Sequence, residues 1–332
     1  MISADALFWM NGRLATQLIS ISHDPADLSD GGFWAVSTTF EGGFTAARFA
    51  TVIEAEFPHH RWEKLEGVWK SSRSQSEFIS YVESIRRSIA DGWVYQVNAC
   101  RELSTPIDKT RNLRGLFSEI LINNPAPWAS YLELPGINIA SAAPELFLKR
   151  TGNRVRTSPI KGTQRPGQSH FGAKDVAENV MIVDLMRNDF GSICASGSVD
   201  VPRLLATEAH PGLFHLVSDV VGRLRSEITW VDIAKYLLPA GSISGAPKSS
   251  ALKAIAEIEK VKRGPYCGVI GFVEGGKAVL SVGIRIFWSE KDGKIHFGTG
   301  AGITWQSEPA AEWEETELKA KRLISIASGA VL

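Results

Sequence analysis

The chain has little of what marks several common classes of protein. Its 332 residues include only three cysteines, and none stands at the CxxC or Cys/His spacing of a zinc site. An odd, sparse set of cysteines is typical of a reducing compartment. Lys and Arg number 36, as do Asp and Glu, so the formal net charge is zero. That balance argues against nucleic acid or a membrane surface as a partner, but not against a small anion held by a few side chains.

Several membrane and catalytic signatures are also missing. No apolar segment is long enough to cross a bilayer, and the first residues lack the basic start and apolar core of a signal peptide, so we expect a cytoplasmic protein. There is no GxSxG, HExxH or helix-opening GxGxxG motif. The stretch GSISGAPKSS (241–250) has Pro247 where a P-loop needs a glycine before its lysine. It is better explained as a glycine-bearing loop before a helix whose first amides can hold an anion.

The apolar pattern predicts strands in hairpin groups with helices between the groups. Residues 1–73 are rich in Trp, Phe, Gly and Thr and alternate like strands, whereas helical spacing begins after Ser74, which can form a capping box with Glu77. Further helices are predicted at 177–190, 231–238, 247–260 and 309–327. The stretches INIASAAPELFLKR and AVLSVGIRIFW read as strands, and EGGK and KDGK as hairpin turns. We therefore predict an α+β fold of antiparallel sheets with helices outside, with a β-rich region, 1–73, packed on a core, 74–328.

The predicted helix at 177–190 carries a carboxylate on its apolar face. Glu178 shares that face with Met181, Ile182 and Leu185, and Asp175 joins it if the helix begins earlier. A buried carboxylate is costly unless it is paired or bound to a cation. On this observation alone, pairing with Lys or Arg is the simpler explanation.

The last predicted helix places Glu312 and Glu315 one turn apart. Acids in the first turns suit the helix dipole, and Glu315 with Lys319 makes a favourable pair at i,i+4. The functional alternative is that these acids meet Glu178 across a cleft and hold Mg²⁺, which uses few carboxylates and keeps positions for ligand oxygens.

Other polar residues stand in suggestive places. Lys161 lies in TSPIKGTQRP (157–166), with turn residues on both sides, and Glu145 follows a proline near a predicted strand end. Arg285 lies within an apolar predicted strand, where it is either a structural residue or a carboxylate clamp. His215 lies on an apolar, helix-like pattern, where a satisfied core histidine is the default. The glycines of GTGAG (298–302) can present amides to an anion or can simply form a turn.

Several stretches together resemble one family. They are VYQVN (94–98), APELFL (143–148), SPIKGT (158–163), AENVMIVDLMRND (177–189), HLVSDVVG (215–222), GSISGAPKSSAL (241–252), YCGVIGF (266–272), GAGI (300–303) and EWEETELKA (312–320). In order and spacing they are similar to the chorismate-utilising enzymes, which include the synthase subunits of anthranilate and aminodeoxychorismate synthases and the isochorismate and salicylate synthases. The resemblance covers 74–328, and residues before it look like a shortened N-terminal region. It implies two large antiparallel β-sheets packed together with helices on the outside.

The resemblance also implies a site. Mg²⁺ would be bound by Glu178 and Glu315, with Asp175 and Glu312 nearby, and would hold the ring carboxylate of chorismate. The enolpyruvyl carboxylate would be held by Tyr266, Arg285 and the backbone of Gly300, Ala301 and Gly302. The remaining substrate contacts that the resemblance implies are Gln96, Thr163, His215 and Ser244.

Lys161 decides which branch of the family the chain resembles. Members that put ammonia on C2 have PIAGT where this chain has PIKGT, and members that add water carry a lysine in place of Gln96. The combination here resembles aminodeoxychorismate synthase. Its lysine amine attacks C2 of chorismate, the 4-hydroxyl leaves with a proton from an acid matched by Glu145, and ammonia at C4 then expels the lysine. The implied product is 4-amino-4-deoxychorismate, the precursor of p-aminobenzoate for folate.

Two features qualify this assignment and two alternatives stay open. Ala143 and Leu146 stand where the family usually has Ser and Arg, and no tryptophan-binding LLES motif is visible, so we expect no tryptophan feedback. No glutaminase domain fits in this length, so we expect a separate glutamine amidotransferase subunit to supply ammonia.

The chain could instead be an anthranilate synthase component I that tolerates Lys161. It could also be a chorismate-binding partner without turnover, against which the intact set of Glu145, Lys161, Glu178 and Glu315 counts.

Overall fold

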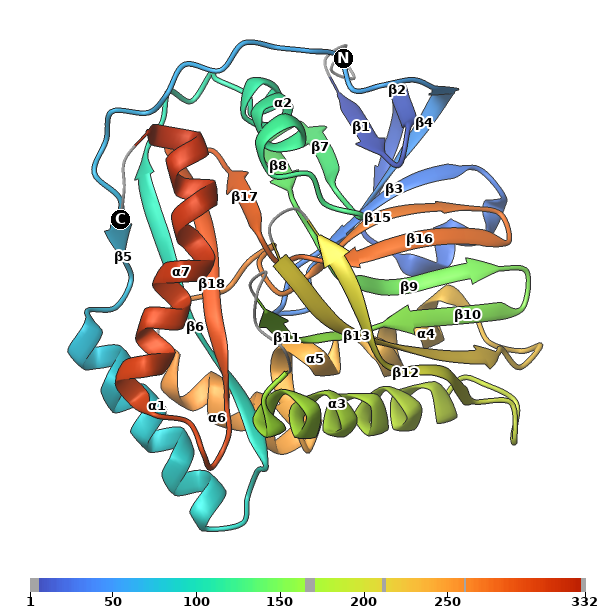
Figure 1. Cartoon of the computed structure of the whole chain (residues 1–332). Helices are drawn as coiled ribbons and strands as arrows, with labels where there is room; N and C mark the ends of the chain where they lie inside the picture. The colour runs from blue at the N-terminus through green and yellow to red at the C-terminus, as the bar shows by residue number, and fades with distance from the viewer. Residues whose placement is uncertain (1–5, 165–170, 211–212, 260, 330–332) are drawn as a thin grey trace.

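A computed structural model describes residues 6–164, 171–210, 213–259 and 261–329 (Figure 1). Its helices are η1 (Pro25–Asp30), α1 (Gln75–Ala90), α2 (Arg114–Asn123), α3 (Ala173–Gly191), α4 (Trp230–Leu237), α5 (Gly241–Ser244), α6 (Lys248–Ile258) and α7 (Pro309–Ser328). The predicted capping box of α1 is confirmed: Ser74 Oγ accepts from the Glu77 amide, and the Glu77 carboxylate accepts from the Ser74 amide. The helices predicted after α1 are confirmed as α3, α4, α6 and α7.

The first strands are β1 (Leu7–Met10), β2 (Arg13–Ser22), β3 (Phe33–Thr38), β4 (Phe44–Glu54), β5 (Lys70–Ser71), β6 (Gln96–Pro106), β7 (Ser130–Leu134), β8 (Ile137–Ser141) and β9 (Leu146–Thr151). The others are β10 (Arg154–Ser158), β11 (Ile160–Gln164), β12 (Asp200–His210), β13 (Leu213–Arg223), β14 (Gly245–Ala246), β15 (Val269–Glu274), β16 (Lys277–Val282), β17 (Ile286–Ser289) and β18 (Lys294–Ile303). The hairpins predicted around EGGK and KDGK are confirmed as β15–β16 and β17–β18.

All pairings of the described strands are antiparallel, and they form one continuous ladder. Its order is β5, β6, β18, β17, β8, β7, β1, β2, β4, β3, β15, β16, β9, β10, β13 and β12. In addition, β14 pairs with β6 and β11 pairs with β13. The half that contains β6 and β18 stands at the left of Figure 1, and the half that contains β9, β10 and β13 stands at the right. The antiparallel α+β class is confirmed, and β1, β2 and β4 join the two halves.

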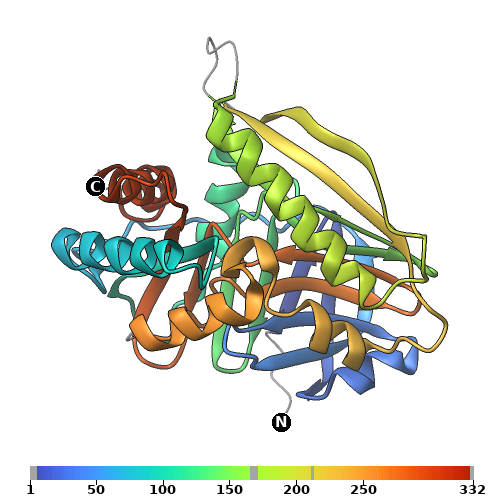
Figure 2. The same ribbon diagram turned by 90° about the horizontal axis from the view of Figure 1, so that it is seen from below.

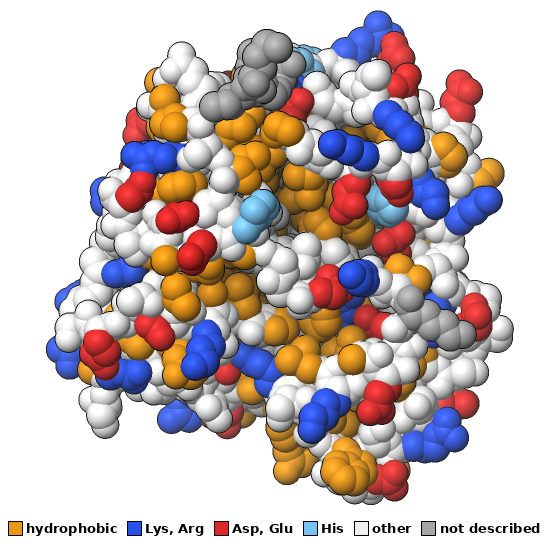
Figure 3. Space-filling view, turned by 180° about the vertical axis from the view of Figure 1, so that it is seen from behind, with side chains coloured by type: hydrophobic (Ala, Val, Ile, Leu, Met, Phe, Trp, Pro, Cys, Tyr) orange, Lys and Arg blue, Asp and Glu red, His pale blue; other side chains and the backbone are white. Residues whose placement is uncertain are grey.

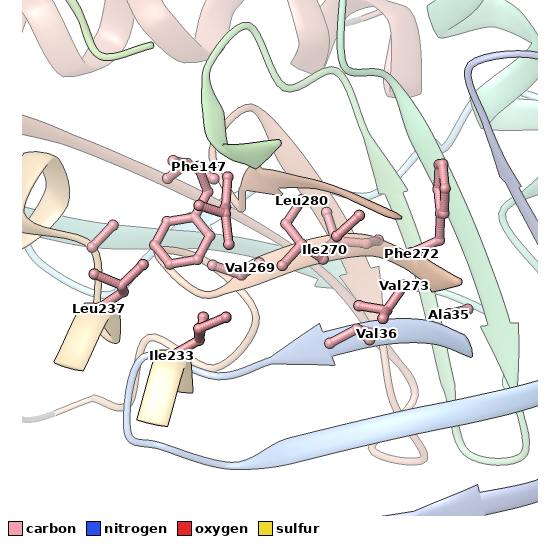
Figure 4. Packing of buried hydrophobic residues seen from close by; sticks show 14 of the residues in the cluster. Ala35, Val36, Phe147, Ile233, Leu237, Val269, Ile270, Phe272, Val273 and Leu280 are labelled. Atoms are coloured by element: carbon pink, nitrogen blue, oxygen red, sulfur yellow. The ribbon is translucent and has the colours of Figure 1, made fainter. Parts of the chain in front are cut away.

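The main hydrophobic core lies where these halves pack together. Phe8 of β1 and Ile139 of β8 belong to one buried cluster with Ile270 and Phe272 of β15 and Leu280 of β16. Figure 4 shows how Phe147, Ile270 and Leu280 interdigitate in this core, with Ile233 of α4 below them. Burial of each such side chain stabilises the fold by roughly 1.5–3 kcal/mol.

The helices cover the outer faces of the ladder. In Figures 1 and 2, α7 and α1 run side by side next to β18, and α3 crosses the strands β11 to β13. The apolar face of α7 packs with α2 on a second core that contains Phe117, Phe287 and Leu323. This arrangement leaves the first turns of α3 and α7 at the junction of the two halves.

The surface carries charges of both signs. Figure 3 shows basic and acidic side chains interspersed over the face seen from behind, with hydrophobic side chains visible between them. This distribution agrees with the zero net charge of the sequence. Among the described residues, none of the helices combines the length and the apolar character that crossing a bilayer requires.

Three predictions from the apolar pattern were wrong in detail. The stretch 137–150 is two strands, β8 and β9, separated at Ala142–Glu145, and the stretch 278–288 is divided between β16 and β17 at Gly283–Arg285. Arg285 therefore lies between strands, with a left-handed φ of 56°, rather than within one. His215 lies in β13, not in a helix, because that strand pairs with β11 and β12 on its two sides.

Candidate active site

Two interrupted strands lie side by side and open a pocket between the halves of the ladder. The break before β9 and the break before β17 are joined by hydrogen bonds from the Ala142 amide to the Arg285 carbonyl (2.9 Å) and from the Val282 amide to the Glu145 carbonyl (3.1 Å). Both breaks face a cavity of ≈ 630 Å³, within the usual size range of small-molecule sites. Glu145 and Arg285 line this cavity, as do residues of β6, β11, β18, α3, α5 and α7.

Lys161 enters the cavity from a distorted strand. Its strand, β11, pairs with β13, but the register shifts between Lys161 and Thr163, where Gly162 adopts a left-handed φ of 81°. A Cβ on Gly162 would lie 2.9 Å from Cβ of Asp175, so glycine also allows α3 to approach the strand. Lys161 Nζ donates to the Ser242 carbonyl at 3.2 Å.

Glu145 is a buried acid with two polar neighbours. Its side chain is 5% exposed, and its Oε1 accepts a hydrogen bond of 2.6 Å from Ser242 Oγ. Burial raises the pKa of Glu145 above its ordinary value, and the Ser242 hydrogen bond, the charge of Lys161 and the Ile160 amide oppose that rise only in part. A carboxyl with a raised pKa next to an amine is suited to give and take protons near neutral pH.

Ser242 links these two groups, and sequence reasoning missed it. Its hydroxyl binds Glu145, and its carbonyl accepts from both Lys161 Nζ and Asn98 Nδ2 (2.9 Å). The predicted residue on the same short helix, Ser244, is buried and donates to the Ala240 carbonyl at 3.0 Å, outside the cavity lining. The sequence offered only the motif GSIS (241–244), and this motif does not show whether Ser242 or Ser244 faces the cavity.

The predicted metal-binding acids meet where α3 and α7 begin. Glu178 and Asp175 of α3 and Glu315 of α7 line the cavity. Glu312 lies next to it, where its Oε1 receives a hydrogen bond of 3.0 Å from Lys174 Nζ. Lys319 Nζ lies 2.6 Å from Glu315 Oε1 as the expected i,i+4 pair, and its charge lowers the pKa of Glu315.

Two carboxylate oxygens of this group fit a cation. Glu178 Oε1 and Glu312 Oε2 are buried without a hydrogen-bond partner among the described residues. Burial raises the pKa of Glu178, and the charges of Lys161 and Lys174 do not fully compensate. The described residues contain no cluster of three His, Cys, Asp or Glu side chains arranged around a metal position. Mg²⁺ does not require one, because it is usually bound by one or two carboxylates together with ligand oxygens and water.

Another part of the cavity lining comes from β18 and from Tyr266. A Cβ on Gly298 would lie 2.0 Å from the Tyr266 ring, so the glycine is needed for the ring to lie over the strand. Gly300 and Gly302 also line the cavity, whereas the side chain of Ala301 packs into the core beneath α1 and α6. Arg285 donates to the Lys319 carbonyl.

The remaining predicted contacts divide into three cases. His215 lines the cavity, with Nδ1 3.5 Å from the Gly162 carbonyl. Gln96 is not part of the cavity lining, and neither its Oε1 nor its Nε2 has a hydrogen-bond partner among the described residues. A Cβ on Gly302 would be 2.4 Å from that Nε2, so the amide lies directly under the glycine. Thr163 belongs to β11, but its side chain lies outside the described part of the chain.

The cavity as a whole can hold a small dianion. Basic side chains line it at several points, and these are Lys161, Lys174, Arg285, Lys319 and Arg322. The acids lie in two places, with Glu145 beside Lys161 and the others at the start of α3 and α7. This arrangement can bind carboxylates and can place an amine nucleophile and an acid on one substrate.

Comparison with known proteins shows which family the chain belongs to. Residues 43–325 match the family model described as chorismate binding enzyme. Anthranilate synthase component 1 of Lactococcus lactis is 35% identical over 287 residues, which cover 83% of this chain and 62% of that protein. Aminodeoxychorismate synthase component 1 of Salmonella typhimurium is 32% identical over 290 residues, which cover 84% of this chain and 63% of that protein. The chain therefore matches less than two thirds of the length of these relatives.

Solved structures show the same fold. Anthranilate synthase component I from Streptococcus pneumoniae superimposes with a TM-score of 0.79 at 24% identity, covering 96% of this chain and 89% of that one. A putative 2,3-dihydroxybenzoate-specific isochorismate synthase from Bacillus anthracis gives a TM-score of 0.82 at 18% identity, covering 98% and 96%. At these identities the likeness concerns the fold alone.

Proposed function

The chain belongs to the family of chorismate-binding enzymes, and on that premise we propose that it is the chorismate-aminating component of an aminodeoxychorismate synthase. The observation that carries the proposal is the position of Lys161. Its amine lies in the cavity, and one residue, Ser242, connects it to the buried acid Glu145. An amine beside an acid is what covalent amination of an allylic alcohol needs.

The proposed reaction uses these two side chains in sequence. The neutral Lys161 amine attacks C2 of chorismate, the double bond shifts, and the 4-hydroxyl leaves as water with the proton that Glu145 donates. Ammonia then attacks C4, the double bond shifts back, and the bond from C2 to the Lys161 nitrogen breaks. Glu145, now ionised, accepts the surplus proton of the incoming ammonia. The products are 4-amino-4-deoxychorismate and water, and Lys161 is regenerated.

The rest of the cavity orients the substrate. Glu178 and Glu315 would hold Mg²⁺, with Glu312 and Asp175 nearby, and the bound ion would neutralise the ring carboxylate of chorismate. Arg285, Tyr266 and the backbone of β18 from Gly300 to Gly302 would hold the enolpyruvyl carboxylate. A separate glutamine amidotransferase subunit would supply the ammonia.

One observation favours a second candidate, anthranilate synthase component I. Relatives with that name, such as the one from Lactococcus lactis, are 35% identical to the chain, against 32% for the aminodeoxychorismate synthase from Salmonella typhimurium. The two candidates differ in the carbon that receives ammonia, so they predict different products from the same substrate.

The test is product identification with purified protein, chorismate, Mg²⁺ and ammonium at alkaline pH. We expect aminodeoxychorismate by mass, which an added lyase converts to p-aminobenzoate. Lys161→Ala should abolish amination at C4 and should bind chorismate as before. Lys149→Ala, which removes an exposed lysine of β9, is the matched control and should leave the product and the rate unchanged. Fluorescent anthranilate from wild type would favour the second candidate instead, and an unchanged rate in Lys161→Ala would refute the role of the lysine.

A further inference from the structure

The short helix α5 contributes to the cavity lining and packs against α3. A Cβ on Gly241 would lie 2.6 Å from both Leu185 Cδ2 and Met186 Cε of α3, so α5 packs closely against that helix and a larger residue would displace these side chains. Ser242 follows directly and is 4% exposed. Because α5 packs against α3 and Ser242 itself is buried, the backbone and side chain of Ser242 have little freedom to move.

The hydroxyl and the carbonyl of Ser242 bind different side chains of the cavity. The hydroxyl donates to Glu145 Oε1 at 2.6 Å. The carbonyl oxygen accepts from Asn98 Nδ2 at 2.9 Å and from Lys161 Nζ at 3.2 Å, which occupies both of its lone pairs. One proton of the lysine amine therefore points at the carbonyl, and the lone pair of the neutral amine is left free for the cavity.

The proposed reaction needs one proton to change places between these groups. Lys161 must lose a proton before it attacks, and Glu145 must hold one when the hydroxyl leaves. A hydroxyl that donates to a carboxylate stabilises its ionised form, so the Ser242 hydroxyl opposes the rise in the pKa of Glu145 that burial causes. When Glu145 takes up that proton, the Ser242 hydroxyl can rotate and accept from it.

The charged groups that face the pair come from several elements. Glu178 of α3 and Glu315 of α7 both interact with the charge of Lys161. Arg285, Lys174 and Lys319 line the same cavity, as does His215 of β13. Among the described residues, Ser242 is the one that hydrogen bonds to both members of the pair.

We propose that Ser242 is a positioning residue that couples Glu145 to Lys161, with its hydroxyl bound to the acid and its carbonyl aiming the amine. The role of this coupling in catalysis rests on the proposed function. The hydrogen bonds themselves make predictions that do not depend on which carbon is aminated.

The experiment compares Ser242→Ala, Ser242→Thr and a matched control, Ser158→Ala. Ser158 Oγ also donates 2.6 Å to a buried carboxylate, that of Asp219, but outside the cavity, and Asp219 keeps a bond of 2.9 Å from Arg203 Nε. For Ser242→Ala we expect the acidic limb of kcat/KM against pH to move up by about one pH unit, because a hydrogen bond to a charged group is lost. We expect kcat to fall about tenfold with KM for chorismate nearly unchanged. Ser242→Thr, which restores the hydroxyl, should return both values toward wild type.

An infrared titration gives a readout that is independent of turnover. The carbonyl stretch of protonated Glu145, identified as the band that Glu145→Gln lacks, should appear at higher pH in Ser242→Ala than in wild type and in Ser158→Ala. If wild type makes no aminodeoxychorismate but this band still shifts, the proposed function fails and the coupling stands. An unmoved band and acidic limb in Ser242→Ala, or an equal shift in Ser158→Ala, would overturn the coupling.

Discussion

Glu178 and Glu315 differ in how their charges are compensated. Glu315 is paired with Lys319 one turn along its own helix, and that pair lowers the pKa of the acid. Glu178 lies 3.8 Å from Lys174, which instead donates its hydrogen bond to Glu312. Glu178 is thus the acid that gains most from a bound cation. The sequence pattern placed it on an inward face, but only the structure shows that its nearest lysine is shared.

We predict that Glu178→Gln abolishes stabilisation by Mg²⁺ without destabilising the metal-free protein. The amide removes a charge whose Oε1 is buried without a hydrogen-bond partner among the described residues, so metal-free Glu178→Gln should melt at or above the wild-type temperature. Wild type should gain about 2.7 kcal/mol when Mg²⁺ is at a hundred times its Kd, and the variant should gain almost nothing. Thermal melts with EDTA and with increasing MgCl₂ measure both quantities.

The exposed pair of Asp184 with Arg187 on the same helix offers a matched control. Asp184→Asn should keep the full response to Mg²⁺, because its side chain is 64% exposed and lies outside the cavity lining. A Glu178→Gln protein that Mg²⁺ stabilises as strongly as wild type would count against the proposed metal site.

At the level of strands and helices, the sequence predicted which elements exist better than where they break. The helices α1, α3, α6 and α7 follow from local caps and apolar spacing, which act within a few residues. The break at Gly283–Arg285 does not, because apolar residues continue through it. The left-handed backbone of Arg285 is held by contacts with a distant segment, including the hydrogen bond from Ala142 to its carbonyl. The positions of Glu145 and Arg285 in the cavity depend on these breaks. The sequence therefore allowed both residues to be predicted as site residues, but not the backbone conformation and contacts that place them there.

The hairpin β17–β18 is tied to β6 through a histidine whose charge depends on pH. His296 stacks on Trp288, and its ring nitrogens lie 2.8 Å from Glu102 Oε1 and 3.0 Å from Asp292 Oδ2. Burial lowers the pKa of His296, but the hydrogen bond and charge of Glu102, with those of Asp292, outweigh it and raise the pKa overall. A histidine with a raised pKa in the folded protein stabilises the fold below its ordinary pKa, and this stability is lost as pH rises through the folded value.

We therefore predict that His296→Gln costs more stability in acid than in base. The free energy of unfolding should fall by about 0.2–1 kcal/mol relative to wild type near pH 5, the usual range for such ion pairs, and the charge-dependent part of that loss should vanish near pH 9. Urea unfolding at the two pH values measures it. His59→Gln, at an exposed histidine, should show no such difference. A loss for His296→Gln that is equal at both pH values would mean that only ring packing matters.

At the scale of the whole molecule, the N-terminal strands connect the two halves of the ladder and are an integral part of it. The strand β1 pairs with β7 of one half, and β3 pairs with β15 of the other. The cavity lies where those halves meet, so its two sides are carried by segments that the N-terminal strands hold together. The family model begins to match at residue 43, within this region. The boundary at residue 73 nevertheless stays a prediction, since pairing alone does not show whether the core folds without its partner.

We predict that a variant beginning at residue 74 does not fold, although it keeps every residue proposed to touch chorismate. It would lose Phe8, Met10, Phe33 and Trp34, each at most 5% exposed, at roughly 1.5–3 kcal/mol apiece. That sum is comparable with the 5–15 kcal/mol that stabilises a typical protein, and the deletion also bares the edges of β7 and β15. Residues 1–73 supplied as a separate chain should restore a cooperative melt, because the missing strands rather than chain continuity are responsible. If the variant alone melts cooperatively near the wild-type temperature, residues 74–328 are an independent domain and the N-terminal strands are an accessory to it.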